Sequence, residues 1–217
     1  MSGLLMKDYR LLLKRKKFFV LLIVIMLVLG GMMDGSFTIT YMPLLVTVIT
    51  ISTISYDELD NGMMFLMSLP VEAKDYAIEK YVLGLIMGGG STLLAFVVQL
   101  VALIVKGESI SIGSCILAAL VTIPIWLLML AVLLPVEIKF GPEKGRIAIF
   151  VVYGIALLIY MGGSKICAML GVDLGGVALT LQNMSNAVKV LTVIGILLVA
   201  LGVSIGISVR VMEKKEF

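Results

Sequence analysis

The sequence predicts an all-α, polytopic membrane protein with six transmembrane helices. Apolar runs, each about long enough to cross a ~30 Å hydrocarbon layer, occupy most of the 217 residues. Hydrophobic residues make up 61% of the chain and charged residues 14%, and the mean hydropathy is +1.17, whereas soluble chains have roughly 25% charged residues. A soluble core could not hide this much apolar surface, so we expect a single six-helix transmembrane domain over residues 1–217.

The segment before the first apolar run, residues 1–17, is basic and amphipathic. Its residues separate onto two helical faces, with Leu5, Tyr9 and Leu12 on one and Lys7, Arg10, Lys14 and Lys17 on the other. This separation is typical of a helix that lies in the headgroup plane of a membrane. No small-residue cleavage site follows, so the first run predicts a retained helix rather than a signal peptide.

Near-unbroken runs of apolar residues define the six predicted spans. They cover residues 18–33, 37–55, 81–105, 112–136, 147–161 and 188–209. An even number of spans places both termini on the same side of the membrane. Of the 17 Lys and Arg residues, only Lys106, Lys165 and Lys189 then fall on the opposite side, so the positive-inside rule predicts that both termini are cytoplasmic.

The longest predicted cytoplasmic loop, residues 56–80, combines acidic and apolar segments. It begins with Asp57, Glu58 and Asp60, continues with an apolar patch over residues 63–67, and breaks at Pro70. This order predicts two short helices, the second begun near Pro70. The patch is too apolar for water and too short to span a bilayer. It therefore lies on the membrane, inserts into a partner protein, where flexible Met side chains suit an irregular groove, or packs under the protein's own helices.

The remaining connections are shorter or more apolar. Residues 137–146 predict a tight Gly-Pro turn with mixed charge, which is also a candidate second contact for a cytoplasmic partner. Residues 162–187 mix glycines with apolar residues, which favours short helices dipping into the outer leaflet over a solvated loop.

Small residues recur within the predicted spans at the spacing of helix packing. Gly84 with Gly88, and Gly202 with Gly206, are each four residues apart, which predicts close helix contacts at both pairs. Ionisable residues are nearly absent from the spans, so the chain lacks the charged ladder that proton relays and ion-driven carriers use.

The residue types exclude several functions. The chain has no His, so Cys115 and Cys167 can form neither a zinc site nor a Cys/His nucleophile, and a buried apolar role is expected for each. The sequence leaves open whether the two pair. No phosphate-binding loop is present, so we expect no catalytic, cofactor or metal residues and no ATP hydrolysis by this chain. The net charge of +3 reflects basic residues that flank the spans and attract lipid headgroups, not nucleic acid.

Four stretches carry a family resemblance. They are Leu-Leu-Met-Lys-Asp-Tyr-Arg-Leu-Leu at residues 4–12, Ser-Tyr-Asp-Glu at 55–58, Leu-Pro-Val at 69–71 and Asp-Tyr-Ala-Ile-Glu-Lys-Tyr at 75–81. With them the chain resembles the small ABC-2 type ABC-transporter permeases of Gram-positive bacteria. The resemblance covers most of the chain, and its specific part lies in roughly the first 85 residues.

The resemblance implies a six-span permease half in the bacterial plasma membrane that pairs with a second permease, identical or different. It also implies two separately encoded ATPases, which hold ATP and Mg²⁺. An interfacial elbow helix would include Leu5, Lys7, Tyr9, Arg10 and Leu12. The implied contacts with the ATPase are Tyr56, Asp57, Glu58, Asp60, Met63, Met64, Phe65, Leu66 and Leu69 in a coupling helix, with Glu143 and Lys144 as a lesser contact. The acids would meet basic residues of the ATPase, and residues 162–187 would form outer re-entrant helices.

The implied activity is outward export of an amphipathic or hydrophobic cargo, such as a peptide toxin, an antimicrobial peptide, a drug or a lipid-like molecule. Three alternatives have comparable size. The vitamin-binding subunit of an energy-coupling-factor importer docks through Ala-rich spacing in its first span, but residues 18–33 contain no Ala. A head-group transferase needs metal-binding aspartates at a spacing that Asp57, Asp60 and Asp75 do not have. A sensory membrane protein that transports nothing remains open.

Overall fold

The computed structural model describes residues 2–32, 37–58, 62–107, 112–169 and 185–215, and these parts are helical apart from short connections. The helices are α1 (Ser2–Lys14), α2 (Lys16–Met32), α3 (Phe37–Ile51), α4 (Thr53–Glu58), α5 (Gly62–Ser68), α6 (Ala73–Lys106), α7 (Ile112–Met169) and α9 (Asn186–Glu213). The all-α prediction is therefore confirmed over the described residues.

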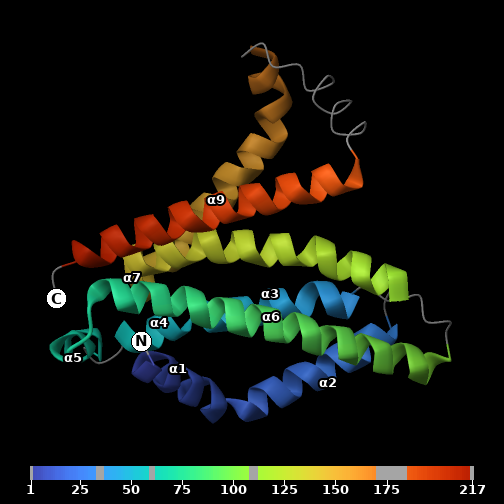
Figure 1. Ribbon diagram of the computed structural model, residues 1–217, viewed down its shortest axis with the longest axis horizontal. Coiled ribbons are helices and arrows are strands. Elements are labelled where there is room, and N and C mark those ends of the chain that lie inside the picture. Colours follow the sequence, from blue (N-terminus) through green and yellow to red (C-terminus); the bar gives the residue numbers. More distant parts are fainter. Residues whose placement is uncertain (1, 33–36, 59–61, 108–111, 170–184, 216–217) are drawn as a thin grey trace.

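Helix α6 is the centre of the bundle, because it contacts α1, α2, α3, α7 and α9. Figure 1 shows α2, α3, α6 and the first part of α7 running alongside one another, with α9 packed on α6 and α7. The short helices α4 and α5 lie at the same end of this bundle as both chain ends (Figure 1). We call it the terminal end. The side of the membrane that it faces stays a prediction.

Four helical stretches of the described chain are long and apolar enough to cross a membrane: Phe37–Glu58, Ala73–Val105, Ile112–Gly141 and Val188–Glu213. They contain the predicted spans 37–55, 81–105, 112–136 and 188–209. The first predicted span lies almost wholly in α2, whose 17 residues extend about 25 Å at about 1.5 Å per residue. The fifth lies in the second part of α7. That these two segments also cross the membrane stays a prediction.

The turn predicted over residues 137–146 is wrong in its extent, because α7 is helical on both sides of a single break. Gly141 has φ 69° and ψ −178°, a conformation that residues with a side chain rarely adopt. Pro142 follows directly, and proline suits the first position of the next helical segment, where its missing N–H leaves no bond unmade. The break redirects the chain, so the second part of α7 stands away from the bundle (Figure 1).

The loop between α4 and α6 also differs from the prediction of two short helices. Helix α5 is the first of them, but no separate second helix begins near Pro70. Instead α6 begins at Ala73 and continues without interruption to Lys106, where Gly107 ends it in a left-handed conformation (φ 68°). The predicted third span is therefore the outer part of a longer helix whose first turns lie at the terminal end.

Two further predictions concern residues 162–187. Helix α7 continues to Met169, and residues 170–184, where the sequence predicts re-entrant helices, lie outside the described residues, as does the side chain of Cys167. Cys115 is buried in an apolar cluster with Ile39 and Leu103, which confirms its expected apolar role.

The first glycine pair brings α6 into close contact with α7. A Cβ atom at Gly84 would collide with Leu130, and one at Gly88 would lie 2.6 Å from Cζ3 of Trp126. Both glycines therefore lie where α6 and α7 approach closely, at the positions where the sequence predicts packing.

The packing role predicted for Gly202 and Gly206 is not found within the chain. Both glycines are exposed on α9, and a Cβ atom at either position would meet nothing within 4 Å. Helix α9 is joined to the bundle by its other face, where the Tyr81 hydroxyl lies 2.5 Å from Oγ of Ser204 and 2.8 Å from Oγ of Ser208. The spacing of the two glycines suits packing, but their face of α9 points away from α6 and α7.

We expect Gly88→Ala to destabilise the protein and Gly89→Ala to be neutral or stabilising. The two glycines are neighbours in α6, so both substitutions give the same gain in helix propensity, but a Cβ atom at Gly89 would meet nothing within 4 Å. Overpacking against Trp126 is expected to cost about 1–3 kcal/mol. The measurement is thermal unfolding in detergent, followed by the fluorescence of Trp126, the single tryptophan. Equal midpoints for the two variants would contradict the close contact of α6 with α7.

Candidate functional site

The exposed apolar patch predicted from the sequence is helix α5, which lies at the terminal end of the bundle. Met63 and Leu66, three residues apart, are buried and belong to the core cluster that also contains Ile54 and Tyr76. Phe65 is 70% exposed. The helix is therefore anchored by one face and presents an aromatic side chain on the other.

The start of α5 packs tightly on the end of α4. A Cβ atom at Gly62 would lie 2.8 Å from the carbonyl oxygen of Asp57, so a side chain at this position would force the two helices apart. On the following turn, the Ser68 hydroxyl donates to the carbonyl oxygen of Phe65 at 2.7 Å and closes the helix locally. These contacts fix how α5 projects Phe65 from the end of the bundle.

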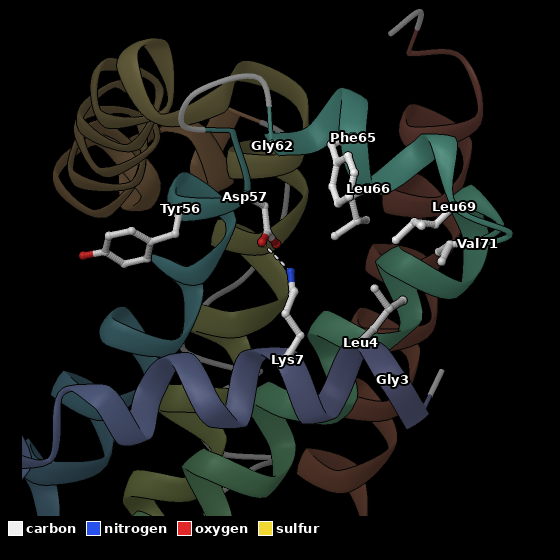
Figure 2. Close-up of a pocket in the computed structure, with 10 residues that line it drawn as sticks. All are labelled: Gly3, Leu4, Lys7, Tyr56, Asp57, Gly62, Phe65, Leu66, Leu69 and Val71. Atoms are coloured by element: carbon white, nitrogen blue, oxygen red, sulfur yellow. Dashed lines mark hydrogen bonds and ion pairs between the residues drawn. The ribbon is translucent and has the colours of Figure 1, made fainter.

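An open groove of about 590 Å³ separates α5 from α1. It is lined by Gly3, Leu4, Lys7, Tyr56, Asp57, Gly62, Phe65, Leu66, Leu69 and Val71. Figure 2 shows α1 crossing one side of the groove, with Phe65, Leu66 and Leu69 on the opposite side. The groove is mainly apolar, and its charged groups are Lys7 and Asp57, which pair with one another.

Buried ion pairs connect α1, α4 and α6 beneath this groove. The carboxylate of Asp57 in α4 accepts hydrogen bonds from Lys7, from Lys80 at 2.7 Å and from the Tyr76 hydroxyl at 3.0 Å. Lys80 also donates to the buried carboxylate of Asp8. We call Lys7, Asp8, Asp57, Tyr76 and Lys80 the charge network. Buried charges of this kind need good geometry and extra hydrogen bonds to offset their loss of hydration. The Asp57 carboxylate has both, whereas Oδ1 of Asp8 accepts no hydrogen bond and has only the ion-pair contact with Lys7 at 3.0 Å.

The environment of Lys7 keeps this residue charged. Burial alone would lower the pKa of Lys7, but the hydrogen bond and the negative charge of Asp57, together with the charge of Asp8, outweigh burial and hold the pKa above its usual 10.5. Since the folded-state pKa is the higher one, the contribution of Lys7 to stability is fully present at neutral pH. It is lost only as the pH rises through that elevated pKa.

The second acid of the loop is also paired within the chain. Glu58 accepts a hydrogen bond from Lys215 at 2.7 Å, and Lys215 also donates to the carbonyl oxygen of Ile138 at 3.3 Å. Glu58 packs against Gly141, where a Cβ atom would collide with its carboxylate. The end of α4 is therefore joined to both α7 and the chain terminus.

These pairs change the interpretation of the acidic cluster. The resemblance implies that Asp57 and Glu58 meet basic residues of a partner, but in the structure each is engaged by a lysine of its own chain. Tyr56 lines the groove. The guanidinium of Arg15 lies over the ring of Tyr56, with Cζ of Arg15 4.5 Å from the ring centroid. Of the other predicted contacts, Asp60 and the side chains of Glu143 and Lys144 lie outside the described residues, and Met64 is exposed.

Helix α1 is present where the amphipathic segment is predicted, but its inward face differs from the prediction. Leu4, Asp8 and Leu12, each four residues apart, are buried, whereas Tyr9 is 52% exposed and Leu5 is half-buried. Leu12 and Tyr9 therefore do not share one face. The inward face instead carries the salt-bridged Asp8 between two leucines. Arg10 is exposed, as a headgroup contact requires.

Sequence reasoning missed Asp8, Tyr76 and Lys80 as members of the site. The signal that could have found Asp8 is its position midway between two leucines at helical spacing. The sequence places Lys80 among the headgroup contacts, although it is buried. Among the described residues, no group of three or more His, Cys, Asp or Glu side chains could hold a metal ion.

Comparison with known proteins gives one finding. A family model described as "ABC-2 family transporter protein" matches residues 3–213. No curated protein and no solved structure matches the chain. The matched range contains α5, the groove and the charge network as well as the long apolar helices.

Proposed function

Because the chain belongs to the ABC-2 family of transporter proteins, we propose that it is the membrane-spanning permease subunit of an ATP-driven exporter. In this proposal a separate ATPase binds ATP and Mg²⁺, and two permease subunits, identical or different, form the path. The family match supports the transporter, and the long apolar helices support a place in the membrane.

The single observation that carries the coupling proposal is the exposure of Phe65 on an anchored helix. An aromatic side chain that is 70% exposed at the end of a membrane protein, beside the exposed Met64, is the kind of residue that forms the centre of a protein interface. We assign α5 as the coupling helix, with Phe65 and Met64 inserted into the ATPase. Asp57 and Glu58, which the structure pairs internally, hold α5 in place instead of meeting the partner.

The contacts of α5 suggest how movement of the ATPase would reach the membrane helices. Displacement of Phe65 moves α5, whose buried Met63 and Leu66 pack against residues of α4 and α6. The charge network ties these two helices to α1 through Asp57, Lys80 and Asp8. Closing of the two ATPases would therefore move α1, α4, α5 and the start of α6 together. Alternating access or lateral extrusion would follow as the two permease bundles rock against each other.

The cargo proposal is an amphipathic or hydrophobic molecule moved outward, such as a peptide toxin, an antimicrobial peptide, a drug or a lipid-like molecule. It is supported by the absence of Asp, Glu, Lys and Arg over residues 82–105, 112–136 and 190–209. A path lined by these helices offers no fixed charge to compensate an ionic cargo.

The experiment that tests the function is co-expression of this chain with the ATPase encoded beside it, followed by purification through a tag on this chain alone. We expect the ATPase to be recovered in an equal ratio and to hydrolyse ATP after reconstitution in lipid. Recovery of the chain without any ATPase, from cells in which that ATPase is present and folded, would count against the permease assignment.

A further inference from the structure

A basic groove lies at the terminal end, where α7 and α9 meet, apart from the groove under α5. Its volume is about 460 Å³, and it is lined by Lys139, Ile207, Arg210, Val211, Lys214 and Lys215. Four of these six residues are cations: Lys139 in α7, Arg210 in α9, and Lys214 and Lys215 directly after the end of α9. The other two are apolar and belong to α9.

Three of the four cations have no carboxylate partner among the described side chains. Lys215 is paired with Glu58. Glu213 lies close enough to Lys74 of α6 to interact with it electrostatically. Lys139 is placed over the ring of Phe140, 5.2 Å from its centroid, and Arg210 and Lys214 are exposed. Among the described side chains, the groove therefore has an excess of positive charge that no carboxylate neutralises.

The charge of the α9 end explains only part of this arrangement. Cations at the C-terminal end of a helix interact favourably with its partial negative charge, which accounts for Arg210 in the last turn of α9 and Lys214 at its C-cap. It does not account for Lys139, which comes from α7 and lines the same groove. Cations converging from two helices are suited to binding an anionic group between them.

An exposed apolar stripe leads from the groove along α9. Val199, Val203 and Ile207 are spaced four residues apart, on one face of the helix, and are 67%, 57% and 48% exposed. Ile207 belongs to both the stripe and the groove. A molecule with a charged head and an apolar chain would fit both, whereas a free phosphate would use only the cations.

We propose that this groove binds the phosphate headgroup of an anionic phospholipid, whose acyl chain lies along Val199, Val203 and Ile207. Lys139, Arg210 and Lys214 bind the phosphate. Bound lipid would cover the three cations that have no carboxylate partner among the described side chains, and it would join α7, close to its break at Gly141, to the end of α9. The site requires neither the ATPase nor a cargo.

The test is native mass spectrometry of the detergent-purified chain with phosphatidylglycerol and, separately, with phosphatidylcholine. We expect phosphatidylglycerol to bind more tightly, and the variant Lys139→Ala/Arg210→Ala/Lys214→Ala to lose at least about tenfold in affinity for it, since each cation near a membrane surface contributes about fivefold. The matched control for a single charge is Lys74→Gln, compared with Arg210→Gln: Lys74 is exposed, pairs with Glu72 and lies outside the groove, so its loss should keep the preference. If the triple variant does not fold, Arg210→Gln replaces it as the test variant, provided that its unfolding midpoint equals that of the unmodified chain.

Three results would overturn the proposal. The first is an unchanged preference for phosphatidylglycerol in both groove variants. The second is displacement of the lipid by millimolar inorganic phosphate, which would show a simple anion site. The third is loss of ATPase binding with unchanged lipid preference in the triple variant, which would make the groove a protein contact.

Discussion

Replacing Phe65 by Glu is expected to abolish recovery of the ATPase with this chain while leaving the fold intact. Because the Phe65 side chain is 70% exposed, it buries little surface within the isolated chain, and its replacement by Glu removes few contacts of the fold. At the centre of an interface, loss of such an aromatic anchor weakens binding by at least about 30-fold, and a desolvated carboxylate adds a further penalty. The measurement is the amount of ATPase recovered per tagged permease, together with ATP hydrolysis in lipid.

The control for this prediction is Phe65→Leu, which keeps an apolar side chain and should retain most of the ATPase. The unfolding midpoint of both variants should equal that of the unmodified chain. Undiminished ATPase recovery with Phe65→Glu would contradict the proposal that α5 lies in the interface with the ATPase. It would leave the family assignment standing.

Replacing Lys80 by Met is expected to destabilise the protein more than Gly88→Ala does. The substitution leaves the carboxylates of Asp8 and Asp57 buried with one cation fewer, and Glu79, also buried, loses a cation 3.9 Å away. Breaking a buried pair in this way costs about 3–5 kcal/mol. For a chain of this size, that corresponds to a fall of about 10 °C in the unfolding midpoint. The measurement is thermal unfolding in detergent.

A matched control lies six residues earlier on the same helix. Lys74 forms an ion pair with Glu72 at 2.6 Å, but both side chains are exposed, so Lys74→Met should change the midpoint very little. The double variant Lys80→Met/Asp8→Asn should be more stable than Lys80→Met alone, since it removes one of the uncompensated charges. Equal effects of Lys74→Met and Lys80→Met would contradict the charge network.

The apolar helices are predictable from sequence because each is a long run of one residue class. Such a run can be recognised without knowing which other helices pack against it. The break in α7 is harder to predict. The pair Gly141-Pro142 is typical of a turn, but proline is also favoured at the first position of a helix, so the same dipeptide permits two helical segments joined by one residue. Tertiary context decides between the two, and the sequence of the pair does not.

The candidate site is predictable only where it is exposed. The apolar patch around Phe65 is visible in the sequence because it is too apolar for its position. The pairing of Asp57 with Lys80 is not, because 23 residues separate them and the contact depends on how α4 packs on α6. The sequence therefore assigns the lysine to headgroups, and the family resemblance assigns the acid to the ATPase. In the structure both side chains are buried, and Lys80 donates a hydrogen bond to Asp57.

The most direct test of the coupling role of α5 is photo-crosslinking in native membranes that contain the ATPase. A photoreactive phenylalanine analogue would replace Phe65 in one variant and, in a control variant, Leu191, which is 71% exposed near the opposite end of α9. We expect the analogue at position 65 to form a covalent adduct with the ATPase and the analogue at position 191 to form none. Adducts of position 65 with lipid or with the permease alone, while the ATPase is present, would contradict the assignment of α5 as the coupling helix.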